Sequence, residues 1–277
     1  MTSMAELDVS LVVPCFNEAA RFDAAAFATA LHGAPWLRLL FVDDGSNDAT
    51  PAILAQFASA HAGRAEVLTL AHNVGKAEAV RQGLLHVVGR GGLCGFWDAD
   101  LSAGLDEVAP LREVFMRHPA VRWVWGIRLR ALGRDIQRKA LRHYLGRLFA
   151  TASSILLDID SYDTQCGAKL FRADALLATA IGTRFLSRWI FDVELLTRAD
   201  MMLRHRGGTG VAEAVFEQPL GTWRHRPGSK VKPGDFVRAL RELWLVRTAR
   251  DDWRRDLLPT VSDQERVRPS SPAITAP

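Results

Sequence analysis

Cysteine is scarce in this sequence of 277 residues, which contains only Cys15, Cys94 and Cys166. An odd number of cysteines without a Cys-x-x-Cys or Cys/His ligand spacing favours neither a disulfide framework nor a zinc site, so we interpret them as reduced thiols. Long apolar runs are also absent, since none reaches the roughly 18 residues that a membrane-spanning helix needs. The first residues, MTSMAELDVS, lack the basic and apolar regions of a signal peptide. These absences favour a cytoplasmic protein without a membrane helix.

Two common nucleotide-binding signatures are missing as well. No GxxxxGK(S/T) segment occurs and no GxGxxG follows the first apolar run, which argues against P-loop kinases and dinucleotide-binding enzymes. No aromatic-basic motif of an RNA- or DNA-binding module is found, so nucleic acid is not an expected partner. The formal net charge is only +4, but basic residues crowd between 122 and 147 and again between 224 and 255. This distribution indicates an anionic partner.

Short β-rich apolar runs alternate with helical patterns from Asp8 to Trp125. The runs are VSLVVPC, LRLLFVDD, AEVLTL, LCGFWDAD and VRWVWG. Such alternation predicts an α/β fold, with a mostly parallel sheet and helices on both faces. Polar or glycine-containing clusters follow the first four runs: NE, DDGSNDAT, NVGK and DADLS. Because ligands of open α/β sheets bind beyond the carboxyl ends of the strands, we expect these clusters to converge into the active site.

The second half of the chain is predicted to contain two basic amphipathic helices. Residues 134–157 place apolar side chains on one helical stripe and basic side chains outside it, and a second such helix is predicted near 234–257. Between them we expect a turn-rich DSYDTQCGAKLFR segment, a helix near 189–205 and a strand near 210–217. The apolar faces of the basic helices have two open interpretations: they pack on the sheet, or they lie in an anionic membrane interface.

The strongest single motif is Asp98-Ala99-Asp100 at the end of an apolar run. Two carboxylates two residues apart at a strand-to-loop junction can both turn toward a divalent cation, and Mg²⁺ and Mn²⁺ prefer such oxygen ligands. Asp158-Ile159-Asp160 has the same spacing but follows a predicted helix, so we interpret it as a solvated turn. A capping or turn role remains the alternative for the first pair.

Three further clusters have a functional and a structural interpretation. Asp44 can accept hydrogen bonds from a ribose or base while Gly45 permits a tight turn and a close backbone approach, or the loop only caps the next helix. Glu18 follows the first strand and is either a site residue or a first-turn acid. Lys76 begins a helix, which is unfavourable for the helix dipole unless an anion or carboxylate lies nearby, or it is simply exposed.

Taken together and in this order, the motifs resemble those of family-2 inverting glycosyltransferases of the GT-A type, and within them the dolichyl-phosphate β-glucosyltransferase and dolichol-phosphate mannosyltransferase group. The segments similar to that group are VVPCFNE, VDDGSNDAT, HNVGKAEAVRQG and FWDADLS. DTQCGAKLFR, RWIFDVELL and GSKVKPGDF are similar to segments of the β-glucosyltransferases. The resemblance runs from Val9 to Val246.

The resemblance implies a GT-A fold and specific site residues. Together with the charge argument for Lys76, it predicts that the nucleotide-sugar is bound by Pro14, Phe16, Glu18, Val42, Asp44, Lys76, Asp98, Ala99, Arg128, Arg224 and Lys230. It implies Mg²⁺ or Mn²⁺ bound by Asp98 and Asp100, and acceptor-side contacts from Asp163 and Gln165. Asp100 and Asp192 are then the catalytic carboxylates. Asp192 takes a proton from a hydroxyl acceptor or orients a phosphate acceptor, and the alternative for Asp192 and Glu194 is a first-turn role in their helix.

The implied reaction is transfer of a hexose, with glucose favoured, from UDP-glucose or GDP-mannose to polyprenyl phosphate, with inversion and with peripheral membrane contact at the inner face of the membrane. A soluble transferase acting on a sugar or metabolite hydroxyl is the alternative, and a non-catalytic nucleotide-sugar-binding protein is a third reading. The predicted organisation is one domain at 8–230, with a nucleotide-sugar half at 8–126 and an acceptor half at 127–230. An amphipathic helix at 231–257 and a disordered tail at 259–277 follow.

Overall fold

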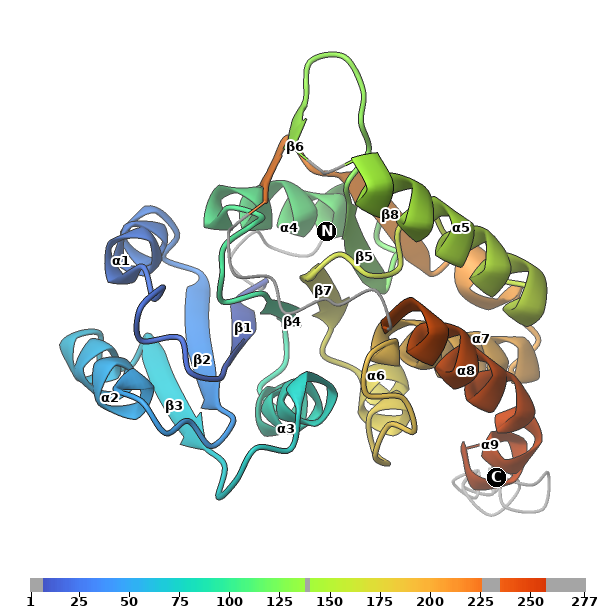
Figure 1. Ribbon diagram of the computed structural model, residues 1–277, viewed down its shortest axis with the longest axis horizontal. Coiled ribbons are helices and arrows are strands. Elements are labelled where there is room, and N and C mark those ends of the chain that lie inside the picture. The colour runs from blue at the N-terminus through green and yellow to red at the C-terminus, as the bar shows by residue number, and fades with distance from the viewer. Residues whose placement is uncertain (1–6, 138–139, 226–234, 258–277) are drawn as a thin grey trace, which may run out of the picture.

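The computed structural model describes residues 7–137, 140–225 and 235–257 (Figure 1). Its centre is a sheet of seven strands. In spatial order these are β3 (Ala65–Thr69), β2 (Leu37–Asp43), β1 (Val9–Cys15), β4 (Leu93–Trp97), β7 (Ala168–Arg172), β5 (Trp123–Ile127) and β8 (Val215–Pro219). Strand β7 runs antiparallel to both of its neighbours, and the other pairs are parallel. The predicted mostly parallel α/β sheet is confirmed.

Helices cover both faces of this sheet, as the continuous apolar runs require. Helices α1 (Ala24–Gly33), α2 (Thr50–Ala60) and α4 (Val108–Arg117) contribute side chains to one core. Helices α3 (Lys76–Val88), α6 (Ala175–Ala180) and α7 (Phe191–His205) contribute to the other. Within β1, Leu11 and Val13 belong to the first core and Val12 to the second. Side chains of a strand alternate between faces, so β1 is buried on both sides.

Strand β7 was not predicted, because its sequence lies in the segment interpreted as turn-rich. It has only five residues, and Lys169 interrupts its apolar pattern. Its place depends on partners far along the chain, since it pairs with β4 on one side and with β5 on the other. Strands from both predicted halves are therefore interleaved in one sheet.

The helix predicted at 134–157 begins later, and α5 spans Ala140–Leu157. Residues Asp135–Gln137 instead form β6, which pairs with β9 (Thr222–Arg224) in a separate two-stranded sheet. Ile136, expected on the helical stripe, is buried in the core of the α1 and α4 face. The prediction was wrong because an apolar residue flanked by polar ones satisfies both helical and strand periodicity over so short a segment.

The C-terminal part also differs in detail from the prediction. Two helices, α8 (Asp235–Thr248) and α9 (Arg250–Leu257), replace the single expected helix, and β8 begins after a short 3₁₀ helix, η3 (Gly210–Ala212). A second 3₁₀ helix, η2 (Leu105–Glu107), precedes α4. Figure 1 shows α5, α7, α8 and α9 gathered beside the β8 edge of the sheet. The predicted disordered tail at 259–277 lies outside the described residues.

The apolar stripe predicted for α5 is divided between the core and the surface. Phe149 is buried, whereas the side chains of Leu148 and Ile155 are exposed. Helix α8 packs against α5 and carries exposed Trp244 and Leu245. Within the described parts of the chain, none of the helices combines the length and apolar character needed to cross a membrane.

Candidate active site

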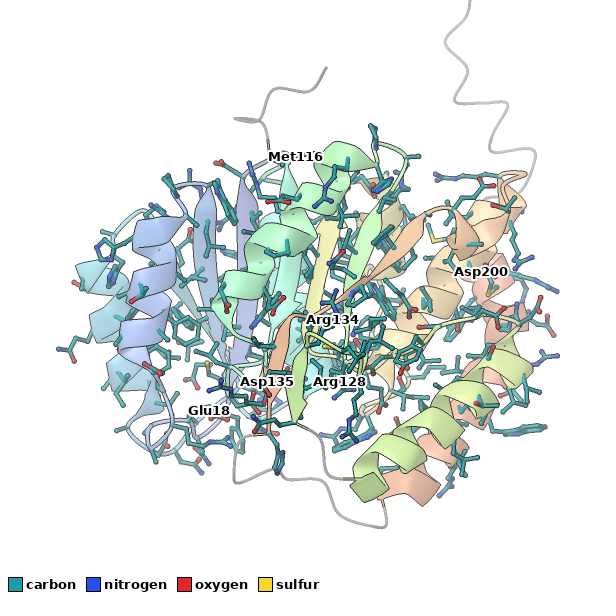
Figure 2. All side chains as sticks on the ribbon, turned by 90° about the horizontal axis from the view of Figure 1, so that it is seen from above. Glu18, Met116, Arg128, Arg134, Asp135 and Asp200 are labelled. Carbon is teal, nitrogen blue, oxygen red and sulfur yellow. The ribbon has the colours of Figure 1, made fainter. Side chains whose placement is uncertain are left out.

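The polar clusters that follow β1, β2, β3 and β4 meet at the carboxyl end of the sheet. Figure 2 shows Glu18, Arg128 and Asp135 at this end and Met116 at the opposite end. The first two loops are joined directly: the Asn17 N–H donates to Ser46 Oγ at 3.0 Å, and the Asn47 N–H donates to Asn17 Oδ1 at 3.0 Å. The Glu18 N–H donates to a hydroxyl of α2. These bonds fix the loop that carries Glu18.

Asp44 joins the loop after β2 to the loop after β3. Its carboxylate accepts hydrogen bonds from the backbone N–H groups of Val74 at 2.7 Å and Gly75 at 2.9 Å, and from the Asn73 side chain at 3.1 Å. Burial raises the pKa of Asp44, and the two backbone bonds oppose that rise. The sequence suggested a ribose or base contact or a cap; in the structure this carboxylate organises the loop before α3. A nucleotide contact by Asp44 stays a prediction.

Gly45 has the conformation that the sequence argument required. Its φ is +65°, and a Cβ at this position would lie 2.5 Å from the backbone carbon of His72. The close approach is therefore to the neighbouring loop, and only glycine combines a left-handed φ with so little space.

Lys76 joins the loop after β3 to the loop after β4, because its ammonium group forms an ion pair with Asp98. Desolvation at the site disfavours the charged lysine, but the neighbouring Asp98, Asp192 and Asp100 outweigh this effect and raise the pKa of Lys76, although its side chain is 46% exposed. The carboxylates supply the negative charge that a lysine at a helix start needs. Both interpretations of Lys76 hold in part, because its side chain is exposed and a carboxylate of the candidate site lies beside it.

Gly167 lies directly beside Asp98. A Cβ at Gly167 would lie 2.1 Å from Asp98 Oδ2. The Asp98 N–H also donates to the Gly167 carbonyl at 3.0 Å. The absence of a side chain at Gly167 therefore makes room for the Asp98 carboxylate.

The donor set at the end of β4 suits a divalent cation. Asp98 Oδ1 pairs with Lys76, and Asp100 Oδ1 accepts a hydrogen bond from the Ser102 N–H at 2.9 Å. Among the described residues, Asp98 Oδ2 and Asp100 Oδ2 accept no hydrogen bond, so these oxygens remain for a cation. No cluster of three or more acidic, histidine or cysteine side chains that could hold a metal occurs in the described ranges. The two carboxylates thus need phosphate and water to complete the coordination shell of Mg²⁺ or Mn²⁺.

The matching pair Asp158 and Asp160 lies in a different environment. It follows α5, and the Asp158 side chain is 92% exposed. Asp158 has a positive φ of 56°, which is typical of a turn. The interpretation of this pair as a solvated turn agrees with the structure.

Arg128 and Asp163 were predicted to contact phosphate and acceptor, and the structure pairs them with each other. Two guanidinium nitrogens of Arg128 lie 2.6 and 2.7 Å from the two carboxylate oxygens of Asp163, and both side chains are largely buried. Burial disfavours the charged guanidinium, but Asp163 outweighs it and the pKa of Arg128 is raised. Glu217 on β8, which the sequence analysis missed, accepts hydrogen bonds from Ser161 and from the Tyr162 N–H and so holds this loop.

The backbone of Arg224 lies beside the loop that carries Asp98 and Asp100. Its N–H donates to the Ser102 carbonyl at 2.8 Å, while its guanidinium pairs with Asp135 at 3.2 Å and is 67% exposed. The guanidinium is therefore accessible to a phosphate. Lys230 lies outside the described residues, and Gln165 is half-buried in the loop before β7.

The remaining predicted nucleotide contacts differ in exposure. Pro14 and Phe16 are half-buried at the end of β1, and Ala99 is buried between Asp98 and Asp100. Val42 is fully buried in the core that faces α3, so its side chain is directed away from the site loops. A contact from Val42 to a nucleotide would have to come from its backbone.

Asp192 lies in the first turn of α7 and is buried. Its Oδ1 lies 2.8 Å from the ammonium nitrogen of Lys169. Burial raises the pKa of Asp192, and Lys169 and Lys76 oppose that rise. Asp192 is thus a carboxylate inside the site.

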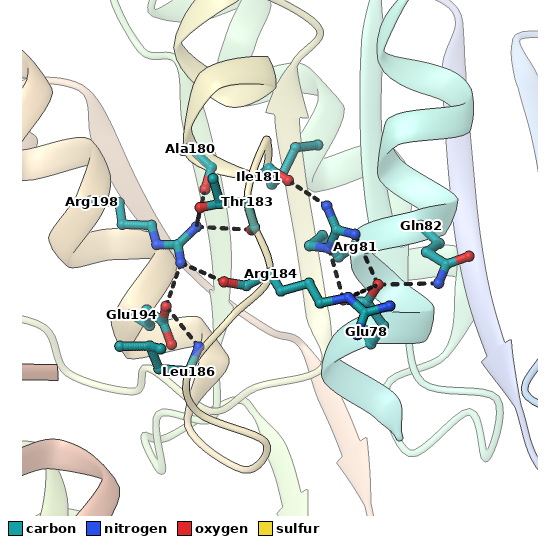
Figure 3. Close-up of polar contacts among 10 residues, drawn as sticks. All are labelled: Glu78, Arg81, Gln82, Ala180, Ile181, Thr183, Arg184, Leu186, Glu194 and Arg198. Carbon is teal, nitrogen blue, oxygen red and sulfur yellow. Dashed lines mark hydrogen bonds and ion pairs between the residues drawn. The ribbon is translucent and has the colours of Figure 1, made fainter. Parts of the chain in front are cut away.

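Glu194, two residues further along α7, has a structural role. It accepts a hydrogen bond from the Leu186 N–H and pairs with Arg198 at 2.6 Å (Figure 3), and it also accepts one from the Ser187 N–H. Arg198 also donates to carbonyls of Ala180 and Arg184. These contacts fix the pre-α7 loop, residues 181–190, that leads to Asp192.

Comparison with known proteins identifies the family. Residues 10–178 match the family model described as Glycosyl transferase family 2. The dolichyl-phosphate beta-glucosyltransferase of Saccharomyces cerevisiae is 30% identical over 267 residues, covering 88% of this chain and 75% of the relative. The enzyme of the same name from Drosophila melanogaster is 30% identical over 266 residues, covering 87% and 74%.

Solved structures share the fold at lower sequence identity. Glucosyl-3-phosphoglycerate synthase from Mycobacterium tuberculosis, solved in complex with Mn²⁺, UDP-glucose and phosphoglyceric acid, superposes with a TM-score of 0.63 at 17% identity, covering 89% of this chain and 80% of that one. The predicted GT-A architecture is therefore confirmed. With the family match over most of the sheet, this chain belongs to glycosyl transferase family 2 and is a glycosyltransferase.

Proposed function

We propose that the protein transfers glucose from UDP-glucose to a polyprenyl phosphate, with inversion at the anomeric carbon. The observation that carries the proposal is the Asp98, Asp100 and Lys76 cluster at the carboxyl end of the sheet, in a chain whose relatives at about 30% identity are named dolichyl-phosphate beta-glucosyltransferases. The neighbouring structure that contains UDP-glucose supports UDP over GDP as the nucleotide. Glucose is favoured over mannose by the names of the relatives.

A divalent cation, Mg²⁺ or Mn²⁺, is proposed at Asp98 and Asp100. When bound there, it would neutralise charge on the diphosphate of the donor. Lys76 lies beside the same carboxylates, and the exposed guanidinium of Arg224 is within the same group of loops. Both cations stabilise negative charge on a departing nucleoside diphosphate, because ammonium and guanidinium groups bind phosphate oxygens.

The role of Asp192 depends on the acceptor. A polyprenyl phosphate already carries the nucleophilic charge, so Asp192 would orient the sugar or the acceptor. A hydroxyl acceptor needs a base to remove its proton, and a buried carboxylate in the site suits that task. Asp163, held by Arg128, and Gln165 belong to the loop proposed for the acceptor side.

The test is a transfer assay with purified protein, Mn²⁺ or Mg²⁺, a panel of UDP- and GDP-sugars and undecaprenyl phosphate in detergent. Glucose-labelled lipid formed from UDP-glucose is the expected product. Labelled lipid formed from another donor would show that the proposed sugar or the proposed nucleotide base is wrong. Transfer only to soluble hydroxyl acceptors would replace the proposal with the second candidate, and binding of donors without turnover would contradict it.

We also propose that the protein works at the cytoplasmic face of a membrane, contacting it peripherally through α5 and α8. Ile155 is 78% exposed and Trp244 is 61% exposed on these two adjoining helices. Arg241 and Arg247 are exposed on α8. Apolar side chains flanked by cations are typical of helices that bind anionic lipid surfaces.

Sedimentation with vesicles of anionic or neutral lipid tests this contact. We expect binding to anionic vesicles, and loss of binding when Ile155→Glu and Trp244→Glu are combined. The control Leu85→Glu changes an exposed leucine on α3 and should leave binding unchanged. Equal binding by the double variant and the control would contradict the proposed surface.

A further inference from the structure

Lys169, in the DTQCGAKLFR segment, is a fully buried lysine to which neither the sequence analysis nor the proposed mechanism gives a role. It lies on β7, the antiparallel strand between β4 and β5, and its exposed fraction is 0%. A lysine ammonium is costly to remove from water unless charged or polar partners surround it. Its presence in the centre of the sheet therefore calls for a specific role.

The ammonium group of Lys169 connects two parts of the site. It lies 2.8 Å from Asp192 Oδ1 in the first turn of α7. It also donates hydrogen bonds to the carbonyls of Thr164 at 2.9 Å and Cys166 at 2.5 Å. These carbonyls belong to the β7 loop, residues 163–167, which carries the predicted acceptor-side residues Asp163 and Gln165.

Aromatic rings complete the surroundings of this cation. The Lys169 nitrogen lies 4.5 Å from the centre of the Trp125 ring and 5.2 Å from that of Phe96. Both distances are within the range of cation–π attraction, which is stronger in a desolvated site. The ammonium group is therefore held in one position by a carboxylate, two carbonyls and two rings.

Asp192 faces charged groups from several elements. Lys169 approaches it from β7, Lys76 from the start of α3, and Asp98 acts on it from the end of β4. Glu194 on the same helix is paired with Arg198 instead. Of the two lysines, Lys169 forms the ion pair with Asp192, while Lys76 forms its ion pair with Asp98.

We infer that Lys169 is a positioning residue, which holds Asp192 as a fixed carboxylate and couples it to the β7 loop on the acceptor side. This inference rests on the proposed function, since it requires Asp192 to face the reacting groups. Lys169 itself is enclosed and touches no reacting atom. The single lysine thus sets both the orientation of Asp192 and the placement of the loop with Asp163 and Gln165.

The test compares the pH dependence of glucosyl transfer in the wild-type protein and in Lys169→Met, which keeps most of the length of the side chain without its charge. An opposite charge within about 4–6 Å changes a carboxyl pKa by about 1–3 units. We expect the acidic limb of the kcat/KM profile to move to higher pH by about this amount in Lys169→Met, since Asp192 loses a cation that favours its ionised form. The ionisation of the acceptor phosphate is common to both proteins and cancels in the comparison.

Phe171→Leu is the matched control, because Phe171 is also fully buried in β7 and carries no charge. It should lower thermal stability without moving the acidic limb. An unshifted profile in Lys169→Met would overturn the inference, whereas absence of glucosyl transfer by the wild-type protein would instead overturn the proposed function.

A second variant decides the matter where Lys169→Met does not fold. Removing one partner of a buried ion pair leaves an uncompensated charge, which is strongly destabilising. We expect Lys169→Met combined with Asp192→Asn to fold, because both charges are then removed. Failure of this double variant to fold would show that Lys169 mainly supports the carbonyls of the β7 loop and would overturn the assignment to Asp192.

Discussion

At the scale of single residues, the site depends on side chains that meet across loops. Asp44 holds the loop of Gly75, Lys76 reaches Asp98, and Asp98 occupies the space left by Gly167. Each contact joins two loops that lie side by side at the end of the sheet but are distant in the sequence. Changes at these positions should therefore affect donor binding more than overall stability.

Gly167→Ala should displace the Asp98 carboxylate, because the added Cβ would lie 2.1 Å from Oδ2. If Asp98 holds the proposed cation, loss of this carboxylate removes several kcal/mol of charge stabilisation. We expect transfer activity to fall by about 10²-fold or more, at about 1.4 kcal/mol for each tenfold change. Steady-state kinetics at varied Mn²⁺ concentration would measure this fall in transfer activity.

Gly89→Ala is the control for this change, since nothing lies within 4 Å of a Cβ at Gly89 and its φ of −72° suits alanine. It should retain wild-type activity. Equal activity of Gly167→Ala and Gly89→Ala would contradict the account of Gly167.

The three cysteines should be unreactive in the folded protein. All three are buried and free, and burial raises the pKa of Cys166 to about 12. A raised pKa leaves almost no thiolate at neutral pH, and the thiolate is the reactive form. Mass spectrometry after iodoacetamide treatment at pH 7.5 should find no labelling in native protein and full labelling in urea. Rapid labelling of native Cys166 would contradict its burial.

Sequence alone identified the acidic motif but not its partners. Asp98 and Asp100 were recognisable because they follow a buried apolar run, and Asp158 and Asp160 were distinguishable because they do not. Lys169 and Glu217 were missed, because the role of a single charged residue in a short strand depends on which residues contact it in space. The mutual pairing of Arg128 and Asp163 was equally invisible, because 35 positions separate them.

At the scale of elements, the pre-α7 loop is held by side chains from several helices. Arg198 and Glu194 bind it from α7, and Glu242 on α8 accepts hydrogen bonds from the Trp189 and Ile190 N–H groups. On its other side, Arg81 on α3 donates to the Ile181 carbonyl (Figure 3). Three helices thus fix the entry to α7 and with it the position of Asp192.

Glu194→Gln should loosen this loop, because Arg198 would remain buried without its carboxylate. Removal of one partner of a buried ion pair costs about 3–5 kcal/mol of unfolding free energy. Urea unfolding would measure this loss, and limited trypsin digestion should show faster cleavage at the exposed Arg184 and Arg188.

The matched change Asp251→Asn breaks an exposed pair with Arg254 and should cost at most about 1 kcal/mol. Similar unfolding free energies for Glu194→Gln and Asp251→Asn would refute the supporting role of Glu194.

Element prediction succeeded where the pattern was long and local. The runs at β1 and β2 were predicted at nearly their observed bounds, since both are continuous apolar segments. The predictions for β7 and for the start of α5 were wrong, because these segments pair with strands that are distant in the sequence. Local periodicity carries no information about such partners.

At the scale of the whole molecule, both halves of the chain build one sheet and one site. The first half supplies Asp98, Asp100 and Lys76, and the second supplies Asp192 and the β7 loop. The proposed donor and acceptor sides therefore meet where β4 pairs with β7. The fold class was predictable from the alternation of strands and helices, whereas this interleaving was not, because it depends on the unpredicted strand β7.

The most direct test of the central claim is glucosyl transfer from UDP-glucose to polyprenyl phosphate by Asp100→Asn, measured beside Asp158→Asn. Both changes remove one charge from an Asp-x-Asp pair, but only Asp100 lies at the carboxyl end of the sheet. We predict a loss of about 10²-fold or more for Asp100→Asn, corresponding to several kcal/mol of charge stabilisation. Asp158→Asn should keep wild-type activity. Equal transfer by the two variants would contradict the assignment of the active site.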